Sequence, residues 1–305
     1  MSDHPGSYLD NTDSLSSALS SLRLSAEVYA NGDYCGQWAV DTSGSRRMPF
    51  HLIGRGEAWL HIDDAAPRRL SAGDLVVFPH DQRHIIASSA VKPAPELINA
   101  GTDTAPGHGP VTHMICGFFD IHSRTTWPLL DSLAPVIVLD VSDLSSTPTI
   151  RTLADLIISE LNRQAPGFYA AINQLAYLLF IQIIRHQIAA GKIDSGPLVA
   201  MFDHRIGKAL AVIHNYPNKR WTLATLAAEA IMGRSSFAKR FNELTGSPPM
   251  QYLTAWRMQQ ATQLIAERKL SIAEIAERCG YESEAAFRKG FKKVTGKTPG
   301  SVRKG

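Results

Sequence analysis

Two stretches of the chain, residues 222–249 and 271–299, repeat one another. Matching positions carry similar residues, and the pairs are Thr222 with Ser271, Leu226 with Ile275, Ala227 with Ala276, Phe237 with Phe287, Phe241 with Phe291, Gly246 with Gly296 and Pro249 with Pro299. Each copy predicts an N-capped helix, a tight turn and a second helix whose apolar positions lie four apart. The second turn has one extra residue. We therefore predict an all-α C-terminal domain that contains two helix-turn-helix units.

The segment between the two copies, MQYLTAWRMQQATQLIAER, predicts a single amphipathic helix. Its length is roughly 25 to 30 Å at about 1.5 Å per residue. In a helix-turn-helix unit the second helix is the recognition helix, which enters the major groove. A connecting helix of this length would place the recognition helices of the two units about one DNA turn apart, close to the roughly 34 Å between successive major-groove faces. Two units in register on one such helix predict a DNA-binding domain.

Charge is divided unevenly along the chain. Residues 201–305 hold 18 Lys and Arg against 8 Asp and Glu, whereas residues 1–200 hold 13 against 20. A basic final third on an acidic body is typical of a nucleic-acid-binding domain attached to a domain that does not bind nucleic acid. A solvated basic surface is the alternative, and the motifs favour DNA.

The repeat also resembles a known family, the AraC/XylS transcription activators, over about 100 residues. The words that carry the resemblance are WTLATLAAEA, RSSFAKRFNELTGSPPMQYL, WRMQQA, LSIAEIAERCGYESEAAF and GKTPGSVR. The resemblance implies two helix-turn-helix units on a shared central helix and binding to double-stranded promoter DNA. Two glycines depart from the pattern: Gly233 stands where the family often has a capping Ser, and Gly290 interrupts the second recognition helix at a cost of about 1 kcal/mol against Ala.

Candidate DNA contacts follow from the helix faces and from the resemblance. With the paired phenylalanines turned inward, each recognition helix turns a set of other residues outward. We predict the DNA-contacting residues to be Arg234, Ser235, Ala238 and Lys239 in the first helix and Ala285, Ala286, Arg288 and Lys289 in the second. Lys239 and Lys289 are expected to read guanine or to hold phosphate, and the alanines to contact methyl groups.

The first half of the chain has a different pattern. From about residue 26 to 139, short apolar runs are broken by Gly, Pro and Asp, which predicts many short strands in a sandwich or barrel. The word GDLVVFPHDQRH resembles the second motif of the cupin barrel family, whose metal-binding histidine matches His84. The first cupin motif is missing, and only His51 lies on the corresponding strand. An iron-dependent oxygenase would need the complete ligand set, so an enzyme is disfavoured.

Two cysteines on separate predicted strands, Cys35 and Cys116, add to these histidines. If Cys35, His51, His84 and Cys116 converge, they form a tetrahedral set for one zinc ion. The arrangement also resembles cupin-containing AraC-type regulators, which include regulators of reactive-chlorine resistance whose sensor cysteines respond to oxidant. That resemblance implies redox sensing through Cys35 and Cys116. Ordinary core residues remain the alternative for all four, and Cys279 is predicted to be a core residue.

Together these patterns predict an α+β multidomain protein. We expect a cupin-like sensor domain at residues 1–140, a helical connector at 141–198 and the DNA-binding domain at 199–305. The apolar connector run LAYLLFIQII predicts a buried helix that packs either against a second copy, giving a homodimer, or onto the barrel. No apolar run approaches the roughly 20 residues that cross a bilayer, and residues 1–12 are polar, so a cytoplasmic location without membrane contact is expected.

The function expected from the sequence is sequence-specific regulation of transcription, with activation and contact to RNA polymerase. The signal is either an oxidant, read by the thiols, or a small molecule bound in the barrel. A cupin metalloenzyme fused to a DNA-binding module is the remaining alternative.

Overall fold

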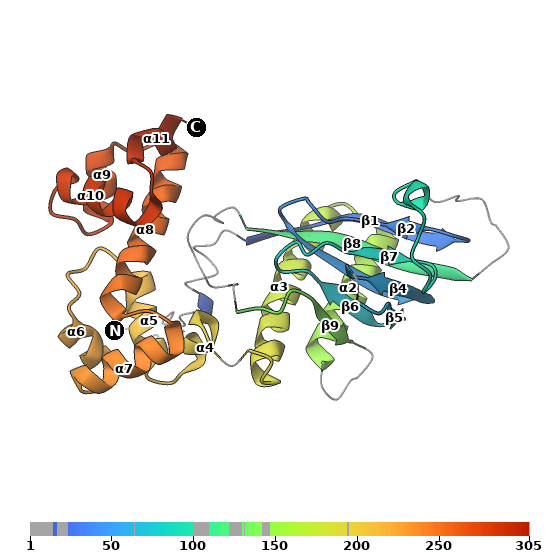
Figure 1. The fold of residues 1–305 in the computed structure, drawn as a ribbon, viewed down its shortest axis with the longest axis horizontal. Coiled ribbons are helices and arrows are strands. Elements are labelled where there is room, and N and C mark those ends of the chain that lie inside the picture. The colour runs from blue at the N-terminus through green and yellow to red at the C-terminus, as the bar shows by residue number, and fades with distance from the viewer. Residues whose placement is uncertain are drawn as a thin grey trace, which may run out of the picture. The chain divides into compact units, whose positions relative to one another are not determined.

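The computed structural model describes residues 15–16, 24–63, 65–100, 110–121, 130, 132–141, 147–193 and 195–304. The chain divides into two compact units, one formed by Leu24–Ile121 with Leu133–Lys192 and the other containing Ile193–Gly305. The strands belong to the first unit, and the repeated helices to the second (Figure 1).

Two antiparallel sheets build the first unit. The five-stranded sheet has the order β1-β8-β3-β6-β9, and the four-stranded sheet has the order β2-β7-β4-β5. The strands are β1 (Leu24–Cys35), β2 (Ala39–Val40), β3 (Met48–Arg55), β4 (Glu57–His61), β5 (Arg68–Ser71), β6 (Asp74–Val77), β7 (Ile85–Ala87), β8 (Val111–Ile121) and β9 (Ile137–Asp140), and a 3-10 turn, η1, spans Pro95–Leu97. The core between the sheets includes Trp38, Phe78, Met114 and Cys116. The predicted series of short strands in the first half of the chain is confirmed.

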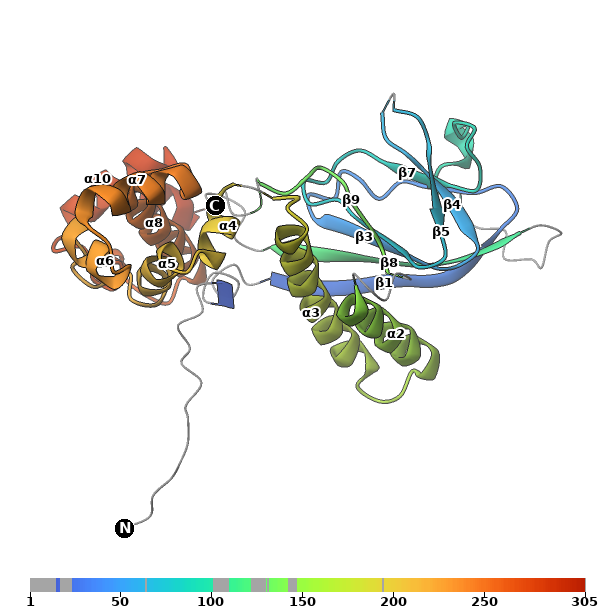
Figure 2. The same cartoon turned by 90° about the horizontal axis from the view of Figure 1, so that it is seen from below.

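Two helices cover the outer face of the five-stranded sheet, opposite the four-stranded sheet (Figure 2). They are α2 (Pro148–Arg163) and α3 (Phe168–Ala189). Phe119 of β8 packs between Phe50 of β3 and Phe180 of α3, with ring centroids 4.6 Å and 5.1 Å apart. Met48 to Ile53 of β3 are therefore buried on both faces, and this part of the strand shows no alternation of buried and exposed residues.

The helical segment predicted as a connector at residues 141–198 lies mostly within the first unit. Helices α2 and α3 belong to the same compact unit as the sheets, because the apolar residues of α3 pack on β1 and α2. Of the two partners that the sequence left open for this helix, the structure shows the packing onto the sheet. Helix α3 is also long and apolar enough to meet the composition criterion for a membrane span. Its residues Ile172, Leu179 and Ile183 are buried within the unit, as in the core helix of a globular domain.

The second unit contains the two helix-turn-helix motifs. Its helices are α4 (Pro197–Phe202), α5 (Ile206–Asn215), α6 (Leu223–Glu229), α7 (Arg234–Thr245), α8 (Pro249–Glu267), α9 (Ile272–Arg278), α10 (Glu284–Thr295) and α11 (Pro299–Lys304). Helix α8 contacts α5 and α7 on one side of the repeat and α9, α10 and α11 on the other. The predicted central helix is therefore present, and its 19 residues span about 28 Å.

Local sequence explains why the repeat folds as it does. Thr222 and Ser271 each cap a helix, with the side chain accepting a hydrogen bond from the backbone N–H three residues later, at 3.1 Å and 3.2 Å. The paired phenylalanines of α7 and α10 are fully buried. Cys279 lies in the core of the second motif, as predicted.

Candidate functional site

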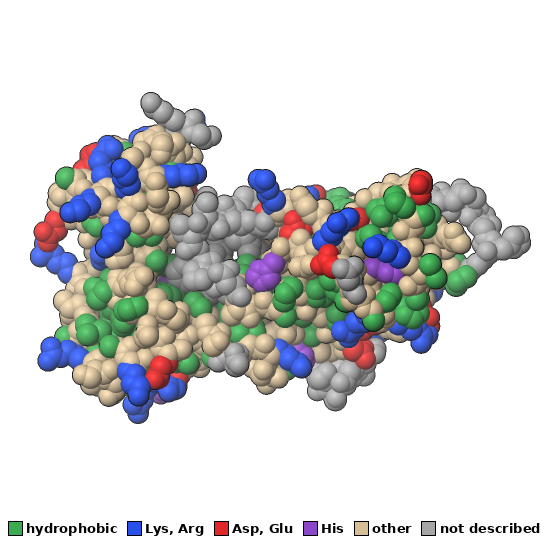
Figure 3. All heavy atoms as spheres, in the orientation of Figure 1, with side chains coloured by type: hydrophobic (Ala, Val, Ile, Leu, Met, Phe, Trp, Pro, Cys, Tyr) green, Lys and Arg blue, Asp and Glu red, His purple; other side chains and the backbone are tan. Residues whose placement is uncertain are grey.

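The predicted DNA-contacting residues lie on the outer faces of α7 and α10. Arg234, Ser235 and Lys239 are exposed, and Ala238 is half-buried. All four predicted residues of α10 are exposed: Ala285, Ala286, Arg288 and Lys289. Figure 3 shows Lys and Arg side chains gathered over the part of the surface where Figure 1 labels α9 to α11. The surface has the charge that phosphate contact requires.

The cationic side chains of this surface differ in whether they form ion pairs within their own helix. Arg288 is paired with Glu284 at 2.6 Å, and Lys239 lies 3.8 Å from Glu243, each one helical turn away. In the described part of the chain, Arg234 and Lys289 form no ion pair. These two cations are free for phosphate or base contact without first breaking an ion pair.

Gly290 of α10 lies against the ring of Tyr281, which belongs to the turn before that helix. A Cβ at position 290 would lie 3.0 Å from the Tyr281 hydroxyl oxygen and 3.4 Å from the nearest ring carbon. The glycine therefore gives the ring room to approach the helix backbone. Gly233, the other departure, begins α7 without a side-chain cap, whereas Ser283 caps α10 through the N–H of Ala286 at 3.2 Å.

In the first unit, four side chains form a chain of hydrogen bonds, and three of them, Cys116, His51 and His84, are buried. The Cys116 sulfur lies 3.1 Å from Nδ1 of His51, and Nε2 of His51 lies 3.1 Å from Oγ1 of Thr42. The same Thr42 oxygen lies 2.9 Å from Nε2 of His84, whose Nδ1 lies 2.7 Å from the carbonyl oxygen of Gln82. His84 also stacks on Phe78, with centroids 3.5 Å apart. His84 points inward, as the cupin resemblance implies.

The carbonyl at one end fixes the direction of every bond in this chain. A carbonyl only accepts, so Nδ1 of His84 donates to Gln82 and Nε2 of a neutral His84 accepts from the Thr42 hydroxyl. Thr42 then accepts from Nε2–H of His51, and Nδ1 of His51 accepts from the Cys116 thiol. The result is an aligned path from the Cys116 S–H to the Gln82 carbonyl, with the tautomers assigned from the hydrogen-bond network.

Burial sets the protonation states in this cluster. Desolvation lowers the pKa of His51 to about 3, with a further lowering from His84, and it also lowers the pKa of His84. Burial raises the pKa of Cys116 to about 12, although hydrogen bonds from the Tyr29 and Tyr34 side chains oppose that rise. Near neutral pH the cluster therefore contains two neutral imidazoles and a thiol, which agrees with the aligned path.

The structure does not bring the four predicted zinc ligands together, because Cys35 lies elsewhere. On β1 the partner of Cys116 is Ala30, whereas Cys35 pairs with Val111 at the N-terminal end of β8. Five residues along a strand correspond to roughly 17 Å, far beyond the span of two ligands on one ion. The odd offset also places Cys35 on the opposite face of the sheet. In the described part of the chain, no group of three or more His, Cys, Asp or Glu side chains is arranged to hold a metal ion.

Thr42 is the member of the cluster that the sequence did not reveal. Thr42 follows the two-residue strand β2 in a stretch without hydrophobic periodicity, so the sequence did not indicate that its side chain would face the two histidines. The pairs His51 with His84 and His51 with Cys116 were predicted to converge, and the structure brings both together.

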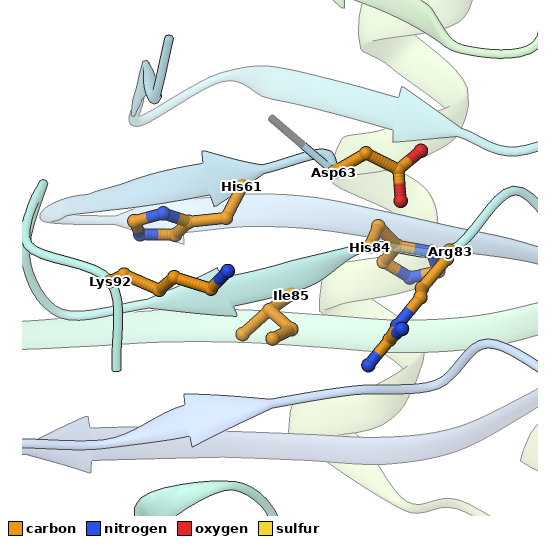
Figure 4. Close-up of a pocket in the computed structure, with 6 residues that line it drawn as sticks. All are labelled: His61, Asp63, Arg83, His84, Ile85 and Lys92. Atoms are coloured by element: carbon orange, nitrogen blue, oxygen red, sulfur yellow. The ribbon is translucent and has the colours of Figure 1, made fainter. Parts of the chain in front are cut away.

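A surface pocket of about 280 Å³ opens beside this cluster and is lined by His61, Asp63, Arg83, His84, Ile85 and Lys92. His61 and Lys92 lie at one end, Asp63, Arg83 and His84 lie at the other, and Ile85 lies between them (Figure 4). Nε2 of His61 lies 3.0 Å from the carbonyl oxygen of Ser89, and Asp63 accepts from Gln82 at 2.7 Å. His84 thus belongs both to the pocket wall and to the buried hydrogen-bond chain.

Comparison with known proteins agrees with both units. A cupin family model matches residues 13–189, and a helix-turn-helix domain model matches residues 226–305. The chain is 30% identical over 303 residues to a putative AraC-like transcription regulator of Streptomyces antibioticus, covering 96% of this chain and 98% of that protein. It is 29% identical over 306 residues to the HTH-type transcriptional regulator AlkR of Acinetobacter baylyi, covering 95% and 99%. It is 25% identical over 254 residues to the RCS-specific HTH-type transcriptional activator RclR of Escherichia coli, covering 83% of each.

The chain belongs to the AraC-like transcription regulators that carry an N-terminal cupin domain. The resemblance deduced from its sequence words and the predicted fold class are therefore confirmed. It is a transcription regulator whose DNA-binding part is the helix-turn-helix unit.

Proposed function

We propose that this regulator activates transcription from promoter DNA and that its cupin unit responds to oxidant through Cys116 and Cys35. The DNA-binding part of the proposal is supported by the exposed basic faces of α7 and α10 on one central helix. The predicted partners are double-stranded promoter DNA, RNA polymerase and a second copy of the chain. Exposed Leu178 and Tyr169 of α3, which are 39% and 56% accessible, support a homodimer through this helix.

The observation that carries the oxidant proposal is the 3.1 Å contact between the Cys116 sulfur and Nδ1 of His51. With hypochlorous acid, the thiol becomes a sulfenic acid while chlorine is reduced to chloride. Sulfur loses two electrons, and the thiol proton has an acceptor at Nδ1 of His51. This contact gives the thiol proton a hydrogen-bond acceptor inside the core, where burial raises the pKa of Cys116 and opposes loss of that proton. Cys35 is half-buried at the end of β1 and reacts independently.

A disulfide between these two cysteines would require the sheet to rearrange. Their strand positions lie roughly 17 Å apart, whereas a disulfide needs Cα atoms about 4.4 to 6.8 Å apart. Oxidation of one thiol, or a bond between copies, therefore fits the proposal better. RclR, whose name describes it as RCS-specific, also favours an oxidant as the signal.

The test is a reporter driven by a promoter that the protein binds, exposed to hypochlorite, peroxide and diamide. Wild type is compared with Cys35→Ala, Cys116→Ala and the double variant. We expect the response to be lost with Cys116→Ala and weakened with Cys35→Ala. If the double variant responds like wild type, the oxidant proposal is wrong. Oxidised wild-type protein, digested and analysed by mass spectrometry, identifies which sulfur carries the oxygen.

The second candidate signal is a small molecule, favoured by the pocket beside His84. Arg83 and Lys92 supply two cations and His61 supplies a ring nitrogen, which suits a ligand with an anionic group. In this case Arg83→Ala and Lys92→Ala would abolish the response to that molecule, while both cysteine variants would respond normally.

A further inference from the structure

Arg257, on the central helix α8, contacts both halves of the repeat. Its Nε donates to the carbonyl oxygen of Pro217 at 2.7 Å, and its guanidinium donates a second bond to the carbonyl oxygen of Lys219 at 2.9 Å. Both carbonyls lie in the loop that leads into α6, the first helix of the first motif. The same guanidinium carbon lies 5.9 Å from the ring centroid of Tyr281, in the turn of the second motif.

The loop and the turn also touch each other directly. Gly280 has a φ of +75°, and a Cβ at this position would lie 2.8 Å from the carbonyl oxygen of Asn218 and 2.9 Å from its Cα. The obstructing atoms belong to the backbone, so they cannot swing away as a flexible side chain would. The same Cβ would lie 2.8 Å from the Arg257 guanidinium. Only glycine fits between the loop, the turn and Arg257.

These contacts extend to the second recognition helix. Tyr281 is followed closely by α10 and packs on Gly290 within that helix, as described above. Arg220 and Glu282 add an ion pair at 2.8 Å across the same boundary, although exposure of both side chains makes it weak. The loop before α6 and the helix α10 are thus held through Arg257, Gly280 and Tyr281.

We infer that Arg257 is a positioning residue that fixes the distance and rotation between α7 and α10, and so restricts the regulator to DNA sites with one spacing between their two contact blocks. The inference rests on the proposed DNA binding through both recognition helices. One inserted base pair moves the second block by about 3.4 Å and rotates it by about 35°. A rigid pair of helices cannot follow that change, whereas a pair released from Arg257 can.

The two backbone carbonyls bonded by Arg257 require a side chain with several hydrogen-bond donors in a fixed plane, as in a guanidinium group. Pro217 and Lys219 offer two acceptors to one residue, and a guanidinium supplies several donors in a fixed plane. Lysine at this position could reach one carbonyl but not hold both in one orientation. A neutral glutamine would supply fewer donors and no charge.

The experiment uses the full-length chain and DNA duplexes that wild type selects from a randomised library. Footprinting identifies the two contact blocks, and duplexes are then made with the selected spacing and with one base pair added or removed. For wild type, we expect each altered spacing to weaken binding at least tenfold. For Arg257→Gln, we expect weaker binding to the selected spacing and a penalty of threefold or less for the altered ones. Arg257→Lys should give an intermediate penalty.

Lys239→Ala provides the matched control, because it removes a predicted DNA contact and leaves Arg257 in place. It should weaken binding to all three duplexes by the same factor and keep the wild-type spacing penalty. If Arg257→Gln behaves in this way too, or binds like wild type, the positioning role is overturned. If Arg257→Gln does not fold, Arg257→Lys replaces it in the test. A folded Arg257→Lys protein that loses as much binding on the altered spacings as wild type would also overturn the positioning role. Failure of wild type to select any duplex would instead contradict the proposed DNA binding itself.

Discussion

A single hydroxyl, that of Thr42, joins the imidazoles of His51 and His84, with Oγ1 lying 3.1 Å and 2.9 Å from their Nε2 atoms. The geometry requires Nε2–H on His51 and Nδ1–H on His84. It also makes Thr42 the residue on which the two buried rings depend for their second hydrogen bond.

Replacing this hydroxyl should destabilise the cupin unit. Thr42→Val keeps the side-chain shape but leaves two buried ring nitrogens unpaired, so we expect the free energy of unfolding to fall by about 1 to 3 kcal/mol. Thr42→Ser, which keeps the hydroxyl, should lose clearly less. Urea denaturation of the full chain measures both, and nitrogen NMR of the imidazoles reports the tautomers. Finding His51 protonated at Nδ1 would contradict the assigned bond direction.

The buried His51 should make stability depend on pH. Its pKa is about 3 in the folded protein and about 6.5 when unfolded, so the unfolded chain binds the extra proton first as the pH falls. Above about pH 6.5 the effect is absent, and at pH 5.5 it should cost roughly 1.4 kcal/mol. His84 acts in the same direction. Denaturation of wild type and His51→Gln at pH 7.5 and 5.5 tests this, and an equal pH dependence in both would count against it.

The two lysines of the recognition helices, Lys239 and Lys289, should each contribute to specific DNA binding. Lys289 is free of ion pairs among the described residues, whereas Lys239 lies 3.8 Å from Glu243. We expect Lys239→Ala and Lys289→Ala each to weaken specific binding by about 1 to 3 kcal/mol if they contact bases. Titrations against the selected duplex and against random DNA separate the two roles. Equal losses on both duplexes would assign a lysine to phosphate.

Gly290 offers a test of its contact with Tyr281. Alanine should favour the helix by about 1 kcal/mol, but its Cβ would crowd the Tyr281 hydroxyl at 3.0 Å. We expect Gly290→Ala alone to change the free energy of unfolding by less than about 0.5 kcal/mol. In a Tyr281→Phe background, where the oxygen is gone, the same change should stabilise by about 1 kcal/mol. Thermal unfolding of the four variants measures the coupling, and additive effects would show that the ring and the glycine do not interact.

The sequence predicted the repeat well because each of its features depends on local rules. Thr222 and Ser271 cap helices through atoms three residues away, and Phe237 and Phe241 share a face because of the helix period. No long-range information was needed for either. The apolar character of α3 likewise predicted burial, but not the surface that would bury it.

The site of the cysteines depended on strand register, which the sequence could not provide. Val28 pairs with Gly117, and unbroken pairing would have placed Tyr29 opposite Cys116 and Cys35 on the same face as Cys116. A bulge between Val28 and Ala30 shifts the pairing by one residue, and Cys35 moves to the other face. The bulge thus decides which face Cys35 occupies, while its distance along the strand separates it from the other three predicted ligands in either register.

The middle of β8, around Cys116, is buried on both faces. Cys116 faces the inner core, Phe119 faces α3, and a Cβ on the intervening Gly117 would lie 2.3 Å from the Phe50 ring. Cys116 is 1% exposed, so an oxygen atom added to its sulfur would have to be accommodated within the close-packed core. Any shift of β8 would also move Phe119, which packs on Phe180 of α3. Strand β8 therefore connects the Cys116 thiol on one face of the sheet with helix α3 on the other.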